Sequence, residues 1–557
     1  MTTMTTPAID APDSRSSELR DNRMPKGIPF IIANEFAERF CFYGINAILT
    51  VYMTQTLRIG DAEATTFHSL FKSGAYFFPL LGAIVSDVFW GKFKTIITFS
   101  LVYAIGCTIL ALVPGSMGLM AGLFLVAFGT GGIKPCVSAN VGDQFTDKNQ
   151  HLIERAFSYF YLAINAGSSI SIFFCPVLLD PANPEAKPRF LADLLLRHDF
   201  YGPKLAFGMP AVAMFVATAV FWMGRHKFTV VAPAGRAWLK DAISPEGLKT
   251  IGSLSVIYLF IACFWALWDQ SNGQTWTLQA ESSLMDKNLG FGWTLLPAQI
   301  QVVNGFFILA MVPIFTFGIY PLMGKFFTVT PLRKISIGFF LTASSFLIVS
   351  WVESRIQGGH VVSVWWQILA YAVLSASEVL VSITGLEFSY KQAPIRMKSF
   401  VTALFLLAVS LGNILTATVN HAMVRPVHAI AAEVGAETWV KIDDASKFVP
   451  GQKIDFGGAT GLTVMKDGKS EPLSGTFLVA DTDAAGNRVK LMDSVERHPV
   501  VSAGRLDASK AEVSTYRLVG PQYFNFFAEI MAAMGVLFIF VAMMYREKTH
   551  VRDESHA

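Results

Sequence analysis

Residues 28–53 decide the fold, and they read IPFIIANEFAERFCFYGINAILTVYM. Most of this stretch is apolar, and it exceeds the roughly 20 residues that cross a bilayer as an α-helix. It also carries Glu35, Glu38 and Arg39, which are spaced i, i+3 and i+4 and so lie on one face of a helix. Ionisable side chains are costly inside a membrane. The stretch therefore predicts a membrane helix with a functional charged face, and the alternative is a purely structural Glu35–Arg39 pair.

The composition of the whole chain is that of a membrane protein. Of its 557 residues, 53% are hydrophobic and only 15% are charged, whereas a soluble domain carries about 25% charged residues. The net charge of +3 is too small to indicate nucleic acid as a partner. The N-terminus is polar and lacks the apolar core of a signal peptide, so we expect the first span to direct insertion.

About twelve apolar stretches have the length of a membrane helix. They lie at 28–53, 68–90, 93–113, 118–140, 156–179, 203–223, 250–270, 293–320, 334–352, 363–390, 397–425 and 518–545. An even number of spans places both termini on one side of the membrane. About 22 Lys and Arg residues fall on that side, against about seven in the loops of the other, which predicts cytoplasmic termini.

The spans divide into two groups of six, a layout found in many secondary transporters. The expected parts are an N-terminal tail at 1–27, a six-helix bundle at 28–223, a cytoplasmic linker at 224–249, helices seven to eleven at 250–425, an insert at 426–517, helix twelve at 518–545 and a C-terminal tail at 546–557. The insert is polar, and runs such as TWVKI and TFLVA alternate with turn signals. We therefore predict an all-α membrane protein with a small β-rich extracytoplasmic unit between helices eleven and twelve.

Neither the cysteines nor other residues suggest a catalytic centre. All five cysteines, Cys41, Cys107, Cys136, Cys175 and Cys263, lie in apolar runs without the spacing of metal ligands. We interpret them as packing residues. No nucleophile–base set is recognisable within the spans, so we expect no enzymatic activity, no cofactor and no metal site.

Further ionisable residues lie inside other spans. Lys134 of the fourth span needs an anionic partner, for which Glu35 and Glu38 are the candidates; alternatively it snorkels to the interface. In the second half of the chain, Asp269 ends FWALWDQ and Glu378 lies in SASEVLVSITGLEFSY. A cavity between the halves would be positive on one side and negative on the other, which suits a zwitterion.

Several strings resemble the proton-dependent oligopeptide transporters of the major facilitator superfamily. They are EFAERFCFYG at 35–44, GTGGIKPCVSANVGDQF at 129–145, FSYFYLAINAGS at 157–168, FWALWDQ with WTLQA at 264–270 and 276–280, and TGLEFSYKQAP at 384–394. GAIVSDVFWGKFK at 82–94 resembles the short inner loop of the superfamily as a whole, with Asp87, Gly91 and Lys92 at the matching positions. Most are similar to those of the family's mammalian intestinal member. The resemblance covers nearly all of the membrane portion. It implies the major facilitator fold and proton-coupled import of di- and tripeptides by alternating access.

The resemblance also implies roles for individual residues. Four would couple protons: Glu35, Glu38, Arg39 and Lys134. Of these, Arg39 and Lys134 would also face the peptide carboxylate, whereas Glu378 would hold the peptide amino group. The other residues expected to bind the peptide are Tyr43, Tyr76, Tyr161, Asn165, Trp265, Trp268, Asn304, Ser382 and Leu386. The implied partners are di- and tripeptides, protons and the lipid bilayer, for a monomer in a cell membrane, the inner membrane of a Gram-negative cell.

The sequence departs from the family's pattern at the outer gate. Asn46 stands where many members have an arginine that pairs with an acid at the position of Asp269. Lys72 of the second span is expected at a comparable depth, from a rise of about 1.5 Å per residue. We therefore predict that Lys72 replaces the arginine and pairs with Asp269. The alternative is that Lys72 snorkels to the outer interface and Asp269 is solvated.

Other departures concern a histidine, a tryptophan and the insert. His68 lies near the second-span histidine of mammalian members, but alignment from Pro79 puts Ser69 at that position, so His68 receives no proton role. Phe405 stands where many bacterial members have a tryptophan. The linker is too short for the two extra helices of many bacterial relatives. The insert follows span eleven, whereas that of mammalian members follows span nine.

Two other functions stay open from the sequence. Plant relatives share the ExxERF motif and carry nitrate, so a proton-coupled transporter of nitrate or another small solute is one alternative. Glu378 favours peptides, because an anion has no amino group for it to hold. The other alternative is a sensor that binds peptides without transporting them. The coupling residues in both halves argue against a sensor. The preferred peptide side chains and the proton stoichiometry are not encoded in any recognisable pattern.

Overall fold

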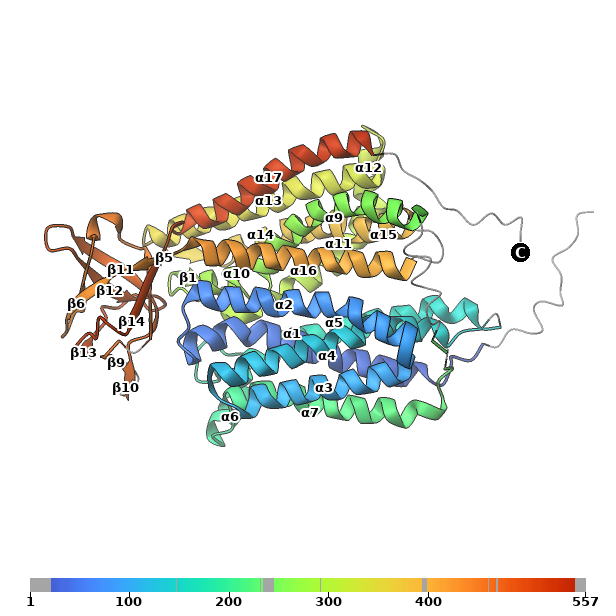
Figure 1. Ribbon diagram of the computed structural model, residues 1–557, viewed down its shortest axis with the longest axis horizontal. Helices are drawn as coiled ribbons and strands as arrows, with labels where there is room; N and C mark the ends of the chain where they lie inside the picture. The colour runs from blue at the N-terminus through green and yellow to red at the C-terminus, as the bar shows by residue number, and fades with distance from the viewer. Residues whose placement is uncertain are drawn as a thin grey trace, which may run out of the picture.

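The computed structural model describes residues 22–146, 148–230, 232–233, 245–290, 292–392, 398–458, 460–466 and 469–545. Long helices run side by side, and a β-rich unit stands at one end of them (Figure 1). We call this the insert end of the molecule. The expected tails at 1–21 and 546–557, and residues 231 and 234–244 of the expected linker, lie outside the described residues.

The long helices form two groups, each with its own apolar core. The first group is α1 (Ile28–Val51), α2 (Asp61–Ile84), α3 (Lys92–Leu112), α4 (Gly115–Asp143), α5 (Ile153–Leu179) and α7 (Pro203–Met223). The second is α9 (Pro245–Ser271), α11 (Val302–Ile314), α13 (Pro331–Gln357), α14 (Trp365–Glu378), α16 (Lys398–Met423) and α17 (Pro521–Met544). We refer to these groups as the first and the second half.

Eleven helical segments of the described chain are long and apolar enough to cross a membrane. They come from every long helix of both halves except α1, which holds the three charges of the opening stretch. The chain is therefore a largely helical membrane protein, as its composition predicts. The number of helices that cross the bilayer, and their orientation in it, stay predictions.

Short elements interrupt the long helices where continuous spans were expected. The stretch 363–390 is α14, a π-helical turn at Val379–Ile383 and α15 (Thr384–Gln392). The stretch expected to begin at 293 starts instead with β3 (Trp293–Thr294), which pairs with β2 (Asn288–Gly290). The helix of that span begins only at Val302, and Pro297 lies between strand and helix. Its start was predicted wrongly, because apolar residues of a hairpin and of a helix share the same hydropathy.

The remaining short helices lie at the ends of the long ones. They are α6 (Arg189–Arg197), α10 (Thr275–Ala280) and α12 (Tyr320–Gly324). The link between α2 and α3 is a π-helical turn at Val85–Trp90 followed by Gly91. Gly91 has a φ of 74°, which a glycine adopts at no steric cost. This residue allows α3 to begin immediately at Lys92.

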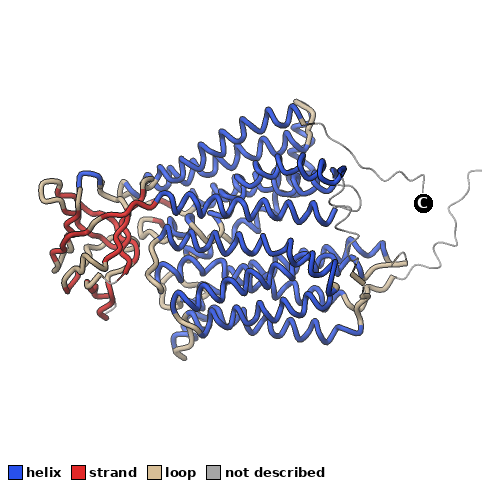
Figure 2. The backbone as a smooth tube through the Cα atoms, in the orientation of Figure 1, coloured by secondary structure: helices blue, strands red, loops and turns tan. Residues whose placement is uncertain are grey.

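The insert is an antiparallel β unit between α16 and α17. Its larger sheet has the strand order β5-β14-β8-β11-β12-β7-β6, and Figure 2 shows strands gathered at this end of the molecule. These strands are β5 (Val424–Val427), β6 (Ala429–Glu433), β7 (Trp439–Ile442), β8 (Lys453–Gly458), β11 (Gly475–Asp483), β12 (Arg488–Asp493) and β14 (Ala511–Tyr516). A smaller sheet has the order β10-β9-β13, with β9 (Leu462–Lys466), β10 (Lys469–Pro472) and β13 (Ser502–Gly504). Ile454, Phe456, Val479 and Leu491 belong to its separate apolar core.

Candidate functional site

The three charges of α1 form one cluster. Arg39 Nε lies 2.6 Å from Glu35 Oε1 and 3.2 Å from Glu38 Oε2. Both carboxylates are buried, and the hydroxyl of Thr130 on α4 donates a hydrogen bond to Glu38. The i, i+3, i+4 spacing places all three α1 side chains on one face, as the sequence predicts. Thr130 was missed, although it stands in the string that contains Lys134.

Lys134 lies against aromatic rings rather than against a carboxylate. Its Nζ is 4.0 Å from the ring centroid of Phe42 and 4.1 Å from that of Tyr76. This nitrogen is buried and has no hydrogen-bond partner among the described residues. The predicted ion pair of Lys134 with Glu35 or Glu38 is therefore wrong for this arrangement. The physical reason is competition, because Arg39 and Thr130 already occupy the two carboxylates.

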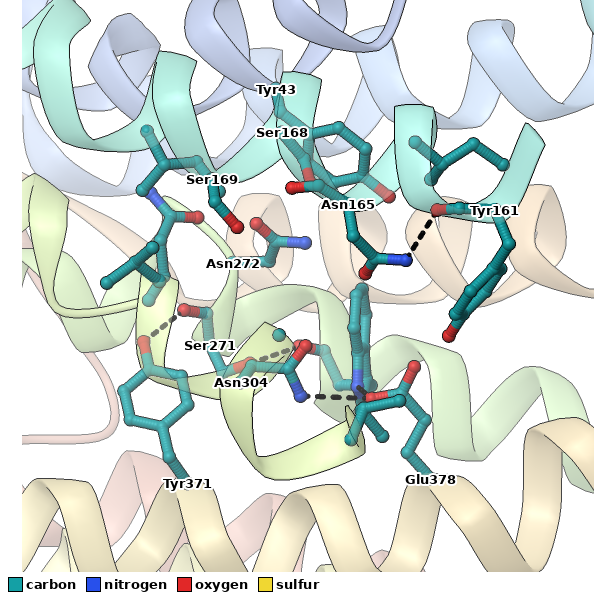
Figure 3. A pocket seen from close by; sticks show the side chains of 17 residues that line it. Tyr43, Tyr161, Asn165, Ser168, Ser169, Ser271, Asn272, Asn304, Tyr371 and Glu378 are labelled. Carbon is teal, nitrogen blue, oxygen red and sulfur yellow. Dashed lines mark hydrogen bonds between the residues drawn. The ribbon is translucent and has the colours of Figure 1, made fainter. Parts of the chain in front are cut away.

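A cavity of about 200 Å³ lies between the halves, and Figure 3 shows its lining. Glu378 closes one side and accepts hydrogen bonds from Trp268 Nε1 at 2.8 Å and from Asn304 Nδ2 at 3.0 Å. Asn304 Nδ2 also lies 2.9 Å from Ser375 Oγ, so the amide holds the carboxylate in place. Across the cavity, Asn165 Nδ2 donates to the carbonyl of Tyr161 at 2.8 Å.

The structure brings together only part of the expected peptide site at this cavity. The expected residues that line it are Tyr43, Tyr161, Asn165, Trp268, Asn304 and Glu378. Trp265 instead packs edge-on against Trp268 with ring centroids 5.2 Å apart. Ser382 lies in the π-helical turn after α14, and Leu386 on α15 is 40% exposed. Neither residue lines the cavity, and nor do Arg39, Tyr76 and Lys134.

Other polar residues of the lining were not predicted. They are Ser168, Ser169, Ser271, Asn272, Gln301 and Tyr371. The hydroxyl of Tyr371 donates to the carbonyl of Ser271 at 2.5 Å. Ser168 ends one of the strings that carry the family resemblance, which is the only signal the sequence offered for this set.

Lys72 and Asp269 form a buried ion pair between α2 and α9. Their side chains are 2% and 3% exposed, and Asn413 Nδ2 donates to the second carboxylate oxygen at 2.5 Å. The pairing predicted from the missing arginine is therefore confirmed, and snorkelling of Lys72 is excluded in this arrangement. We call Lys72 and Asp269 the gate pair. Their role in opening and closing a path between the halves stays a prediction.

Polar contacts between the halves surround the gate pair. Asn46 Nδ2 lies 2.9 Å from Asn272 Oδ1, and Thr50 donates to the carbonyl of Gly273 at 2.5 Å. The His68 ring lies 2.8 Å from both Asn46 Oδ1 and Thr50 Oγ1. His68 therefore takes part in these contacts. We call them the seal at the insert end, and its residues are Asn46, Thr50, His68, Asn272 and Gly273.

Tyr161 of α5 lines the cavity from the first half. Tyr161 is 48% exposed and Leu162, the next residue of α5, is 65% exposed. Asp269, by contrast, is 2% exposed. The ion pair and the hydrogen bonds around it thus hold the halves together towards the insert.

Two overlapping stretches of the chain match one known protein family. A family model described as the POT family matches residues 93–243 and 236–440. The chain belongs to this family. The matching proteins are named as transporters or solute carriers.

Curated relatives of this POT-family chain are named as peptide transporters or solute carriers. It is 35% identical over 373 residues to peptide transporter family 1 of Drosophila melanogaster, covering 60% of this chain and 48% of that protein. It is 37% identical over 377 residues to solute carrier family 15 member 2 of Homo sapiens, covering 60% and 49%. The chain thus spans about half the length of the curated relatives it matches.

Solved structures of POT transporters share its fold. The transporter PepTSo is 32% identical with a TM-score of 0.61, covering 72% of this chain and 90% of that one. The crystal structure of an auto-inhibited POT family peptide transporter is 26% identical with a TM-score of 0.67, covering 95% and 99%. The second match extends over almost the whole chain.

Proposed function

We propose that this protein is a proton-coupled symporter that imports di- and tripeptides by alternating access. The observation that carries the proposal is the placement of Glu378 at a cavity between the halves, held by Trp268 and Asn304. A carboxylate fixed in this way accepts a charge-assisted hydrogen bond from an ammonium group. Glu378 holds the amino terminus of the peptide.

The opposite end of the peptide is held by Arg39 and Lys134 once the cavity extends to them during the cycle, since neither lines it in the arrangement described. Support comes from Lys134 Nζ, which is buried and lacks a hydrogen-bond partner among the described residues. Leaving a buried ammonium without such a partner is costly. A peptide carboxylate supplies what is missing, and the aromatic rings of Phe42 and Tyr76 stabilise the cation until it arrives.

Proton coupling resides in Glu35 and Glu38 with Arg39. Two acids share one guanidinium at 2.6 and 3.2 Å, so protonating one of them leaves the other paired. Lys134, which lies against Phe42 and Tyr76 in this arrangement, joins the group in another state of the cycle, in which one of the carboxylates becomes its partner. The remaining expected binding residues, Tyr76, Trp265, Ser382 and Leu386, contact the peptide as the cavity changes shape during the cycle.

In this proposal α1 crosses the membrane as well, giving twelve helices arranged as six plus six. The two apolar cores support the division into halves. The termini are cytoplasmic, the insert is extracytoplasmic, and the protein is a monomer in the cell membrane. The seal around the gate pair then makes the arrangement described here inward-facing.

Uptake into proteoliposomes tests this function directly. A labelled dipeptide should accumulate when the outside is acidic and should only equilibrate without a proton gradient. The matched arm uses nitrate with the same vesicles. Accumulation of nitrate alone would replace the peptide assignment. Peptide binding without uptake in either condition would make the protein a sensor.

A further inference from the structure

The insert is tied firmly to the second half. Met423 ends α16 and Val424 begins β5, and the Arg517 amide donates to the Met423 carbonyl at 2.9 Å. At its other end, only residues 517–520 separate β14 from α17. Arg497 Nη1 also donates to the carbonyl of Ile356 on α13 at 2.8 Å. The insert must therefore move together with the second half.

The insert also contacts the first half, at the start of α2. Lys453 Nζ of β8 lies 2.5 Å from Asp61 Oδ2, with the two side chains 35% and 15% exposed. Arg58, just before α2, lies 3.1 Å from Glu471 of β10. Both pairs join residues of opposite charge across the boundary between the two halves.

The insert further supplies the cap that α2 lacks. The N-cap residue is Gly60, which has no side chain to accept hydrogen bonds from the first helical amides. The amide of Asp61 donates instead to Thr476 Oγ1 at 2.9 Å, and the amide of Ala62 donates to the Tyr516 hydroxyl at 3.2 Å. A helix of one half is thus capped by hydroxyls that travel with the other.

One carboxylate organises these hydroxyls. Asp455 accepts a hydrogen bond from Thr476 at 2.7 Å and another from Tyr516. A Cβ atom at Gly60 would overlap Asp455 Oδ2, so the insert sits against a position where glycine alone fits without rearrangement. Burial raises the pKa of Asp455 to about 7, Asp61 adds to this, and Tyr516, Thr476 and Lys453 oppose it.

We infer that the insert is a clasp, which holds the two halves together at the insert end and must release the start of α2 whenever they separate there. The inference rests on the alternating access of the proposed function, in which that end opens once in every cycle. The clasp residues are Arg58, Asp61, Lys453, Asp455, Glu471, Thr476 and Tyr516. The interactions between the insert and α2 exist only while the halves are together, so each of them favours the closed state.

A reversible cross-link between Gly60→Cys and Asp455→Cys tests the clasp. A Cβ at Gly60 would lie 3.2 Å from Asp455 Cβ, just short of the about 3.5–4.5 Å that disulfides span between these atoms, so a small shift accommodates the bond. Of the five native cysteines, four are buried and Cys263 is half-buried. Oxidation should stop peptide uptake, and a reductant should restore the rate of the reduced variant. Fully cross-linked protein that transports at its reduced rate would overturn the inference.

The matched control is a cross-link inside the insert. Gly457 of β8 and Glu512 of β14 are cross-strand partners, and a Cβ at Gly457 would lie 3.6 Å from Glu512 Cβ. This disulfide joins no residue of the first half. Oxidation of Gly457→Cys/Glu512→Cys should leave uptake unchanged, and an equal loss of uptake in both variants would also count against the clasp.

A second measurement needs neither a cross-link nor transport. Spin labels at Lys204→Cys, at the start of α7, and Lys441→Cys, on β7, report the distance between the first half and the insert, and both positions are exposed. Lys453→Met with Thr476→Val should shift the population towards longer distances. Lys490→Met, which removes a salt bridge within the insert, should not. Identical distributions in both variants would refute the clasp even if the protein carried no peptide.

Discussion

The gate pair gives the sharpest test of how the halves close. Asp269→Asn keeps the shape of the side chain and leaves Lys72, which is 2% exposed, without its carboxylate. Removing one partner of a buried ion pair costs about 3–5 kcal/mol. Since Lys72 regains water when the halves separate, this cost falls on the closed state alone.

The expected shift follows from that asymmetry. At about 1.4 kcal/mol per factor of ten, the closed state loses about two to three and a half powers of ten in relative population. The assay is the spin-label distance between Lys204→Cys and Lys441→Cys in a Cys263→Ala background, together with peptide uptake. The control is Arg189→Gln, which breaks an exposed pair with Asp193 and should change the population little.

The charge swap separates the pair from its surroundings. Lys72→Asp with Asp269→Lys should recover closed-state distances and uptake that either single change loses. Unchanged distances in Asp269→Asn, or a swap that recovers neither property, would refute a gating role for the pair.

The remaining predictions concern the coupling cluster, the peptide amine and the clasp. Glu35→Gln should abolish gradient-driven accumulation while preserving peptide counterflow, because glutamine keeps the shape and loses the titration; undiminished accumulation would contradict this. Glu378→Gln should weaken peptides by about 1.5–3 kcal/mol relative to analogues without an amino group, measured as competition for uptake; equal losses would mean that Glu378 does not hold the amine. The pKa of Asp455 is raised to about 7 in the docked clasp, so docking takes up a proton. The closed population should therefore grow as the pH falls from about 7 towards the usual carboxyl range, and it should level off above about 7. Asp455→Asn should remove this part of the pH dependence of the label distance, and an unaltered pH profile would contradict it.

Local patterns predicted the parts of the structure that depend on neighbours in sequence. The shared face of Glu35, Glu38 and Arg39 follows from helix geometry alone, and the structure has it. The gate pair joins residues 197 positions apart, yet it was predictable, because two opposite charges at the same depth of an apolar bundle have few other partners.

The sequence did not reveal which of several candidate partners a charged residue binds in the folded chain. Lys134 had two candidate acids, and only the folded chain shows that Arg39 and Thr130 take them. The insert's contact with α2 joins Lys453 to Asp61 across 392 positions, in polar sequence outside the expected spans, where charges have many possible partners. Nothing in the periodicity of either segment points to the other.

The two devices that close the insert end act on the same helix, and this makes their independence testable. Asp61 and Lys72 both lie on α2, about 16 Å apart along the helix at 1.5 Å per residue. Effects of changes at sites more than about 7–10 Å apart usually add within about 0.3–0.5 kcal/mol when the sites share no partner. Lys72 is bound to Asp269, and Asp61 to the insert, so no partner is shared.

Combining Asp269→Asn with Lys453→Met should therefore change the open-to-closed ratio by the product of the factors that the two single changes produce. A smaller combined shift would mean that one device already releases the other, with α2 and the insert opening as a single step. If the free-energy changes of the two single variants add to within about 0.5 kcal/mol in the double variant, the gate pair and the clasp each oppose opening on their own. In that case loss of the insert's interactions with α2 weakens closure and leaves the gate pair to maintain it.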